Sequence, residues 1–302
     1  MIVVIAFVAN ILVAIAKSVA AVLTGSASLV AEASHSWADA GNEIFLLVAD
    51  RRSTRSKDDG HPLGFGREAY VWSLLAAVGV FTVGAVVSVM HGIQEMFDPE
   101  PASDYLIAYI VLGVSALLEG ASLLQSVIQA RRTAAKYRRE AFDYVLNGSD
   151  PTLRAVVAED SAALAGLAIA FLGILLHQLT GNPFWDALGS VLIGLLLAVV
   201  AVVLINQNRR YLVGFNPPPR FRTGAAEQLL AQPEIARITY LHLEFVGPSR
   251  LFLVAAVDLA GDEREEHVAR VLRRIERTIE ENELVEQAVL TLSVSDEPSL
   301  EF

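Results

Sequence analysis

The sequence predicts an α-helical membrane protein that ends in a small α+β domain, and three observations support this. Hydrophobic residues make up 54% and charged residues 19% of the 302 residues, whereas soluble domains carry about 25% charged residues. Six long apolar runs fall before residue 206, which fits the mean hydropathy of +0.47. The remaining stretch shows the shorter, mixed periodicities of a soluble fold.

The charge balance and the absence of cysteine exclude several classes of function. Lys and Arg number 23 against 34 Asp and Glu, so the net charge is −11 and the isoelectric point about 5.0. A protein that binds nucleic acid normally presents a basic surface, and we expect no nucleic-acid partner. Disulfides, thiolate metal sites and cysteine nucleophiles are excluded because the chain has no cysteine.

The six apolar runs predict a transmembrane domain over residues 1–210. A spanning helix needs about 20 mostly apolar residues. The first run lacks the basic start of a signal peptide and stays apolar for too long to be one, so we interpret it as a retained span. The predicted spans are Ile2–Leu23, Ser28–Ala49, Tyr70–Met90, Tyr105–Ala130, Leu153–Leu176 and Phe184–Ile205.

The loops between the spans predict the orientation of the chain. Lys and Arg are absent from the loops after the first, third and fifth spans. Basic residues gather in the loops after the second, fourth and sixth spans, so the positive-inside rule places both termini in the cytoplasm. With no recognisable presequence, we expect the inner (plasma) membrane of a prokaryote. The basic residues are Arg51, Arg52, Arg55, Lys57, Arg67, Arg131, Arg132, Lys136, Arg138, Arg139, Arg209 and Arg210.

Residues 211–302 predict a cytoplasmic domain that begins after a proline-rich linker. The element order helix, strand, strand, helix, strand (αββαβ) is that of a ferredoxin-like fold, a three-stranded sheet covered on one side by helices. The expected elements are a helix at Gly224–Ala231, strands at Arg237–Phe245 and Leu251–Leu259, an amphipathic helix that includes Val268 to Ile279, and a strand at Ala288–Val294.

Ionisable residues inside the predicted spans are the candidate functional residues. Each costs about 2.5–3.5 kcal/mol at the centre of a span and therefore needs a reason to be there. His35, Asp39 and Glu43 follow one another at four-residue intervals, so they share one face of the second span. Asp39 lies about 15 Å from the inner surface, and Asp160 of the fifth span lies at a similar depth. Imidazole and carboxylate ligands from two antiparallel helices suit Zn²⁺.

Other readings of these polar residues stay open. His35 and Asp39 can also link helices by hydrogen bonds, without a metal. Lys17 either snorkels outward or pairs with an acidic neighbour, and Glu119 either pairs with Lys17 or relays protons. Asn10 is a hydrogen bonder between helices or part of an ion path.

Three stretches resemble the cation diffusion facilitator family of zinc/proton exchangers. The resemblance covers nearly the whole chain, and it implies six spans, both termini inside and an αββαβ tail that forms a homodimer or regulates. The fifth-span pattern is most similar to the zinc transporter nine branch. The stretches are Gly25 to Asp39, His61 to Glu68, and Glu159 to Ala163 followed by Gly181 to Pro183 and Asp186 to Ser190.

The resemblance implies a metal site made of His35, Asp39 and Asp160. Typical zinc members also place a His or Asp four residues before the fifth-span aspartate, where this chain has Val156. The fourth ligand is then Glu159, Glu43 or a water molecule, although Glu159 points about 100° away from Asp160 on the helix.

Two further regions correspond to metal sites in some members of the family. His61, with Asp58 and Asp59 beside it, falls where some members hold a second zinc; the alternative is a solvated loop histidine. The tail offers only His242 and His267, so we expect it to dimerise without a binuclear zinc cluster.

The sequence therefore predicts a homodimeric exporter of a divalent metal, above all Zn²⁺, driven by inward flow of H⁺. Metal ligation displaces protons from imidazole and carboxylate groups, so one site serves both ions. Mn²⁺ is the alternative substrate because oxygen ligands suit harder ions, and Co²⁺, Ni²⁺ and Fe²⁺ stay open. A scaffold or metal sensor without transport is a further hypothesis. We expect that the protein is not an enzyme, since the sequence has no His-Glu-x-x-His metalloprotease motif.

Overall fold

The computed structural model describes residues 2–99, 104–136, 140–147, 150–214, 217–261, 263–294 and 296–302. The chain folds into two compact units. One unit comprises residues 1–50 and 71–209 and is helical. The other comprises residues 51–70 and 210–302 and contains the sheet. Arg138 and Arg139 of the second basic loop lie outside the described residues.

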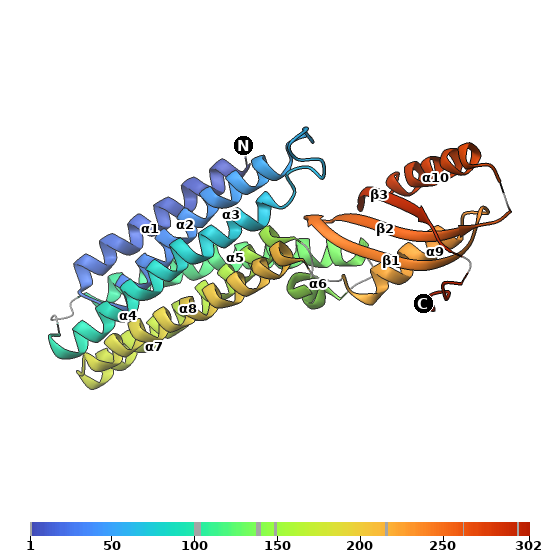
Figure 1. The fold of residues 1–302 in the computed structure, drawn as a ribbon. Helices are drawn as coiled ribbons and strands as arrows, with labels where there is room; N and C mark the ends of the chain where they lie inside the picture. The colour runs from blue at the N-terminus through green and yellow to red at the C-terminus, as the bar shows by residue number, and fades with distance from the viewer. Residues whose placement is uncertain are drawn as a thin grey trace. The chain divides into compact units, whose positions relative to one another are not determined.

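Long helices lie side by side in the helical unit (Figure 1). The third predicted span is one continuous run in which a π-helical turn, η1, joins α3 to α4. The described helices are α1 (Ile2–Thr24), α2 (Ala27–Ser53), α3 (Glu68–Ala76), η1 (Ala77–Phe81), α4 (Thr82–Phe97), α5 (Tyr105–Lys136), α6 (Ala141–Asn147), α7 (Pro151–Thr180) and α8 (Phe184–Val213).

Among the described residues, four stretches are long and apolar enough to cross a membrane, by length and composition. They are Glu68–Phe97, Tyr105–Ala135, Pro151–Thr180 and Phe184–Val213. Of α1, Asn10–Thr24 forms a shorter apolar stretch. Helix α2 is long enough to cross a membrane but is not among these stretches, because Glu32, Asp39 and Glu43 interrupt its apolar sequence.

The start of α2 is fixed by a carboxylate from α8. Gly25 ends α1 in the left-handed region (φ +63°), where glycine is strongly favoured. Asp186, 3% exposed, then accepts hydrogen bonds from Ser26 Oγ (3.0 Å) and from the backbone amides of Ala27 (2.8 Å) and Ser28 (3.2 Å). A carboxylate at a helix start satisfies unpaired amides and complements the helix dipole. These hydrogen bonds fix the first turn of α2 against the first turn of α8.

Small residues let α2, α7 and α8 approach closely. A side-chain carbon on Gly189 of α8 would overlap the Ser28 hydroxyl, and one on Gly166 of α7 would overlap a carboxylate oxygen of Glu32. Close backbone approach through small residues is the usual packing of membrane helices. Polar side chains of α2 are therefore buried directly against the backbone of neighbouring helices.

The second unit contains the element order that the sequence predicts for the tail. Strands β1 and β2 are antiparallel, β2 and β3 are parallel, and the sheet order is β1-β2-β3. Apolar residues of both tail helices and all three strands form one core cluster, which includes Leu229, Ile275 and Ile279. The elements are α9 (Pro219–Leu230), β1 (Ile235–Gly247), β2 (Arg250–Leu259), α10 (Glu265–Glu280) and β3 (Val285–Leu292).

The basic loop at residues 51–70 belongs to this second unit. Lys57 Nζ lies 2.9 Å from Glu286 Oε1, and Arg67 forms an ion pair with Glu244. The ring of Tyr70 stacks on that of Tyr211, with centroids 4.8 Å apart. The chain that leaves α2 is thus bound to the sheet domain by charge pairs and aromatic packing.

Candidate functional site

His35 and Asp39 form a buried pair on one face of α2. The distance from His35 Nε2 to Asp39 Oδ1 is 3.4 Å, and the side chains are 1% and 13% exposed. Within the described residues, neither ring nitrogen of His35 has a hydrogen-bond partner, nor has Asp39 Oδ1. Buried polar atoms are normally hydrogen-bonded, so a group of unsatisfied atoms requires an explanation such as a bound ion.

The two acidic residues of α7 are held by different helices. Asp160 Oδ2 accepts hydrogen bonds from Ser122 (3.0 Å) and Ser126 (3.2 Å) of α5. Glu159 accepts a hydrogen bond from the side-chain amide of Asn42 of α2. Adjacent positions on α7 therefore face two neighbours, as the 100° separation on a helix requires.

The structure brings together some of the predicted ligands and separates others. His35 and Asp39 are a pair, while Asp160 is bonded to serines. Glu43 Oε1 accepts a hydrogen bond from Asn10 (2.7 Å), and its Oε2 has no partner within the described part of the chain. In that part, no three His, Asp or Glu side chains are close enough to hold one metal ion. Val156 packs with the apolar core around Leu197.

A second buried charge network lies beside the His35–Asp39 pair. Lys17 Nζ lies 3.0 Å from Glu32 Oε2 and 4.0 Å from Glu119 Oε1, and the Lys17 and Glu32 side chains are 1% and 0% exposed. The geometry agrees with the interpretation in which Lys17 pairs with acidic neighbours. Buried ions of opposite sign offset part of each other's desolvation.

The sequence-based set of buried charges omitted Glu32 and the polar partners of the acids. Glu32 precedes His35 by three positions, and residues three apart share a helix face. That spacing was the signal that could have identified it. Ser122 and Ser126 follow Glu119 on α5 at helical spacing, but a serine inside an apolar run is a weak signal because it satisfies itself by bonding to its own helix.

The loop candidates His61 and Asp59 lie in the second unit. His61 Nδ1 is 2.8 Å from Asp58 Oδ1, and both side chains are about half exposed. This hydrogen bond lowers the pKa of the Asp58 carboxyl below its ordinary value. Asp59 is exposed beside them. The loop therefore presents one His–Asp pair with an adjacent carboxylate at the surface.

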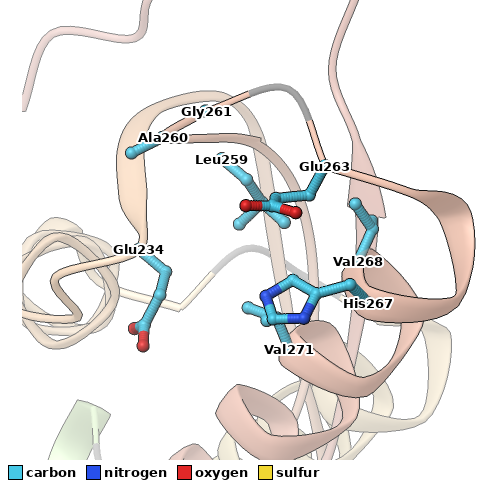
Figure 2. A pocket seen from close by; sticks show the side chains of 8 residues that line it. All are labelled: Glu234, Leu259, Ala260, Gly261, Glu263, His267, Val268 and Val271. Atoms are coloured by element: carbon cyan, nitrogen blue, oxygen red, sulfur yellow. The ribbon is translucent and has the colours of Figure 1, made fainter.

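The two tail histidines lie on different elements. His242 of β1 has its Nε2 4.0 Å from Glu244 Oε2. His267, at the start of α10, lines a small cavity of about 100 Å³, where Glu234 lies across the cavity from it (Figure 2). The carboxylate of Glu234 forms an ion pair with Arg274, in which Nη2 lies 2.6 Å from Oε1. Neither histidine joins a group of three possible metal ligands among the described residues.

The helical bundle with buried charges defines a membrane protein, and comparison with known proteins specifies its family. A model of the cation efflux transmembrane domain matches residues 3–213. Metal tolerance protein C4 of Arabidopsis thaliana is 36% identical over 77% of this chain and 51% of its own length. A mitochondrial proton-coupled zinc antiporter of Xenopus laevis is 37% identical over 81% of this chain and 44% of its own.

The chain belongs to the cation efflux family, the cation diffusion facilitators. An uncharacterized transporter of Methanocaldococcus jannaschii is 22% identical over 97% of both chains. The chain spans about half the length of the first two relatives. The resemblance stated from the sequence motifs is thereby confirmed at the level of the family.

Proposed function

We propose that this protein exports a divalent metal ion, above all Zn²⁺, across a membrane in exchange for protons. Family membership and similarity to proteins named proton-coupled zinc antiporters support this. The observation that favours a site in the helical unit is the buried His35–Asp39 pair, whose imidazole nitrogens lack hydrogen-bond partners among the described residues.

In this proposal His35, Asp39 and Asp160 bind the transported ion. Imidazole and carboxylate ligands suit Zn²⁺. Ser122 and Ser126 both bond to Oδ2 of Asp160, which leaves Oδ1 for a metal. No three candidate ligands are close enough to hold one ion in the described part of the chain, so metal binding must bring α7 and the α2 pair closer together. Glu159 and Glu43 are the candidates for a fourth ligand, because Val156 cannot bind metal.

Proton exchange follows from the chemistry of the ligands. A metal binds neutral imidazole and ionised carboxylates, so its arrival releases protons and proton binding releases the metal. Rocking of the helices around this site would open it alternately to each side of the membrane. Glu119, which lies 4.0 Å from Lys17, and Asn10, which donates a hydrogen bond to Glu43, are candidates for the proton path.

The remaining parts of the proposal concern the whole assembly. Six spans follow from the six apolar runs of the sequence, and the basic loops favour a cytoplasmic location for both termini. Residues 1–210, apart from the loop at 51–70, form the transport domain, and residues 211–302 form a cytoplasmic domain that pairs two copies of the chain. His61 and Asp59 are the candidates for a second, peripheral metal site on the loop; the alternative is a solvated histidine that only pairs with Asp58.

Flux measurements in reconstituted vesicles test the proposal. With a pH gradient and external Zn²⁺ or Mn²⁺, the wild type should move Zn²⁺ in preference to Mn²⁺. Asp39→Ala should reduce zinc flux to background, because it removes one of the proposed ligands, while Glu227→Ala on the exposed face of α9 should transport as wild type.

The same measurement separates the alternatives. Faster flux of Mn²⁺ than of Zn²⁺ would make this a manganese exporter. No flux of any of the divalent ions, with a folded wild-type protein in the vesicles, would favour a scaffold or sensor.

A further inference from the structure

Glu32 is a fully buried carboxylate whose two oxygens have different surroundings. Lys17 Nζ donates a hydrogen bond to Oε2 at 3.0 Å. Oε1 has no hydrogen-bond partner within the described residues. One half of the carboxylate is therefore fixed by an ammonium group, and the other half is left available.

The available oxygen of Glu32 and the Nδ1 atom of His35 face the same point on α7. A side-chain carbon built on Gly166 would overlap Glu32 Oε1 and would lie 3.7 Å from His35 Nδ1. The other ring nitrogen, Nε2, faces Asp39 at 3.4 Å. Nε2 of the imidazole therefore faces a carboxylate, and Nδ1 lies near the same Gly166 position as the free oxygen of Glu32, without a hydrogen bond to it in this structure.

We propose that Glu32 is a positioning residue: when the metal ion binds, its free Oε1 accepts a hydrogen bond from His35 Nδ1–H and so presents Nε2 to the ion. This inference rests on the proposed transport function and names a further residue at its site. Metal-ligating histidines generally donate their other N–H to a carboxylate or carbonyl, which fixes the tautomer and raises the basicity of the ligand nitrogen. Glu32 has the location and the free acceptor that this role requires.

Lys17 explains why Glu32 acts on the histidine and not on the metal. An unpaired carboxylate beside a divalent cation would itself become a ligand, and an oxygen-rich site favours harder ions such as Mn²⁺. The ammonium group holds Glu32 Oε2 and offsets its charge. Glu119 Oε1 is a second acidic neighbour of Lys17, at 4.0 Å.

The consequence is a selectivity that depends on Glu32. Zinc relies on the imidazole ligand more than manganese does, because nitrogen ligands suit Zn²⁺ and oxygen ligands suit Mn²⁺. Loss of the Glu32 hydrogen bond should weaken zinc binding selectively. A residue with a merely structural role would, when replaced, change the binding of both ions together.

Two variants test this in the full chain, purified into lipid nanodiscs. Competition with a chelating dye gives the affinities for Zn²⁺ and for Mn²⁺. Glu32→Gln should lower zinc affinity by about 10–100-fold, the usual effect of losing such a carboxylate, with little change for manganese. Gly166→Ala keeps every charge but displaces Glu32 Oε1, and it should lower zinc affinity in the same direction by a smaller factor.

A matched control is available on α5. Gly113→Ala adds the same carbon at a position where, in the described residues, no atom outside its own stretch of helix lies within 4 Å. It should leave the ratio of the two affinities at the wild-type value. If Glu32→Gln does not fold, the Gly166→Ala and Gly113→Ala pair gives the result.

Distinct outcomes separate this inference from the transport proposal. Unchanged affinities in Glu32→Gln and Gly166→Ala, or an equal loss for both ions, overturn the role of Glu32 even when the wild type transports zinc. A selective loss of zinc binding supports that role, including in a wild type that shows no flux, in which case only the transport proposal fails.

Discussion

Ion pairs of similar chemistry lie in very different surroundings in the two units of the molecule. In the helical unit, Lys17 and Glu32 are 1% and 0% exposed. In the sheet unit, Arg270 and Glu266 of α10 pair one helical turn apart and are 75% and 79% exposed. Water solvates the second pair whether or not it forms, whereas the first pair has only protein around it.

This difference shows where charge is informative in the chain. A surface ion pair contributes little to stability, and acidic residues on a solvated helix are ordinary. A buried charge in an apolar helix is expensive and therefore marks a function or a specific partner. The buried charges of α2 and α7 therefore indicate a function, whereas the exposed charges of α10 do not.

The largest expected contrast comes from removing one cation in each unit. Lys17→Met leaves Glu32 buried without its partner, and breaking a buried pair in this way lowers the free energy of unfolding by about 3–5 kcal/mol. Arg270→Met in α10 should change it by less than about 1 kcal/mol. Thermal unfolding of the two purified variants and the wild type in the same detergent measures the two effects. Equal effects of the two substitutions would show that Lys17 is not in a dry environment.

A smaller contrast concerns how helices begin. Asp186 is buried and caps α2, whereas the N-cap position of α10, Arg264, makes no side-chain cap hydrogen bond. Asp186→Ala should cost about 1–2 kcal/mol, as does the loss of other helix caps, and Arg264→Ala should leave stability near the wild-type value. The same unfolding assay measures both. An Asp186→Ala protein as stable as the wild type would exclude this cap as a determinant of the fold.

Much of the fold could be predicted because its causes are local. Apolar runs of sufficient length predict helices, and the predicted helix at Ser28–Ala49 lies within α2. Alternating apolar residues predict the strands at Arg237–Phe245 and Leu251–Leu259, which lie within β1 and β2. The attachment of residues 51–70 to the sheet unit could not be predicted, because it depends on pairs such as Lys57 with Glu286 that lie far apart in the sequence.

The candidate site was only partly predictable, for the same physical reason. Helical spacing places His35 and Asp39 together, and the structure has them as a pair. Spacing along one helix says nothing about which neighbour a carboxylate meets. The partners of Asp160, Ser122 and Ser126, could therefore not be predicted, nor could the position of Glu32 Oε1 beside Gly166 of α7.

Metal analysis of the purified protein tests most directly the claim that α2 and α7 hold the transported ion together. After equilibrium dialysis against zinc, the wild type should retain one more zinc per chain than a His35→Ala, Asp160→Ala double variant. A His61→Ala variant should keep that ion, because His61 lies in the second unit and not in the helical unit. Equal zinc content in the wild type and in the folded double variant would contradict the account.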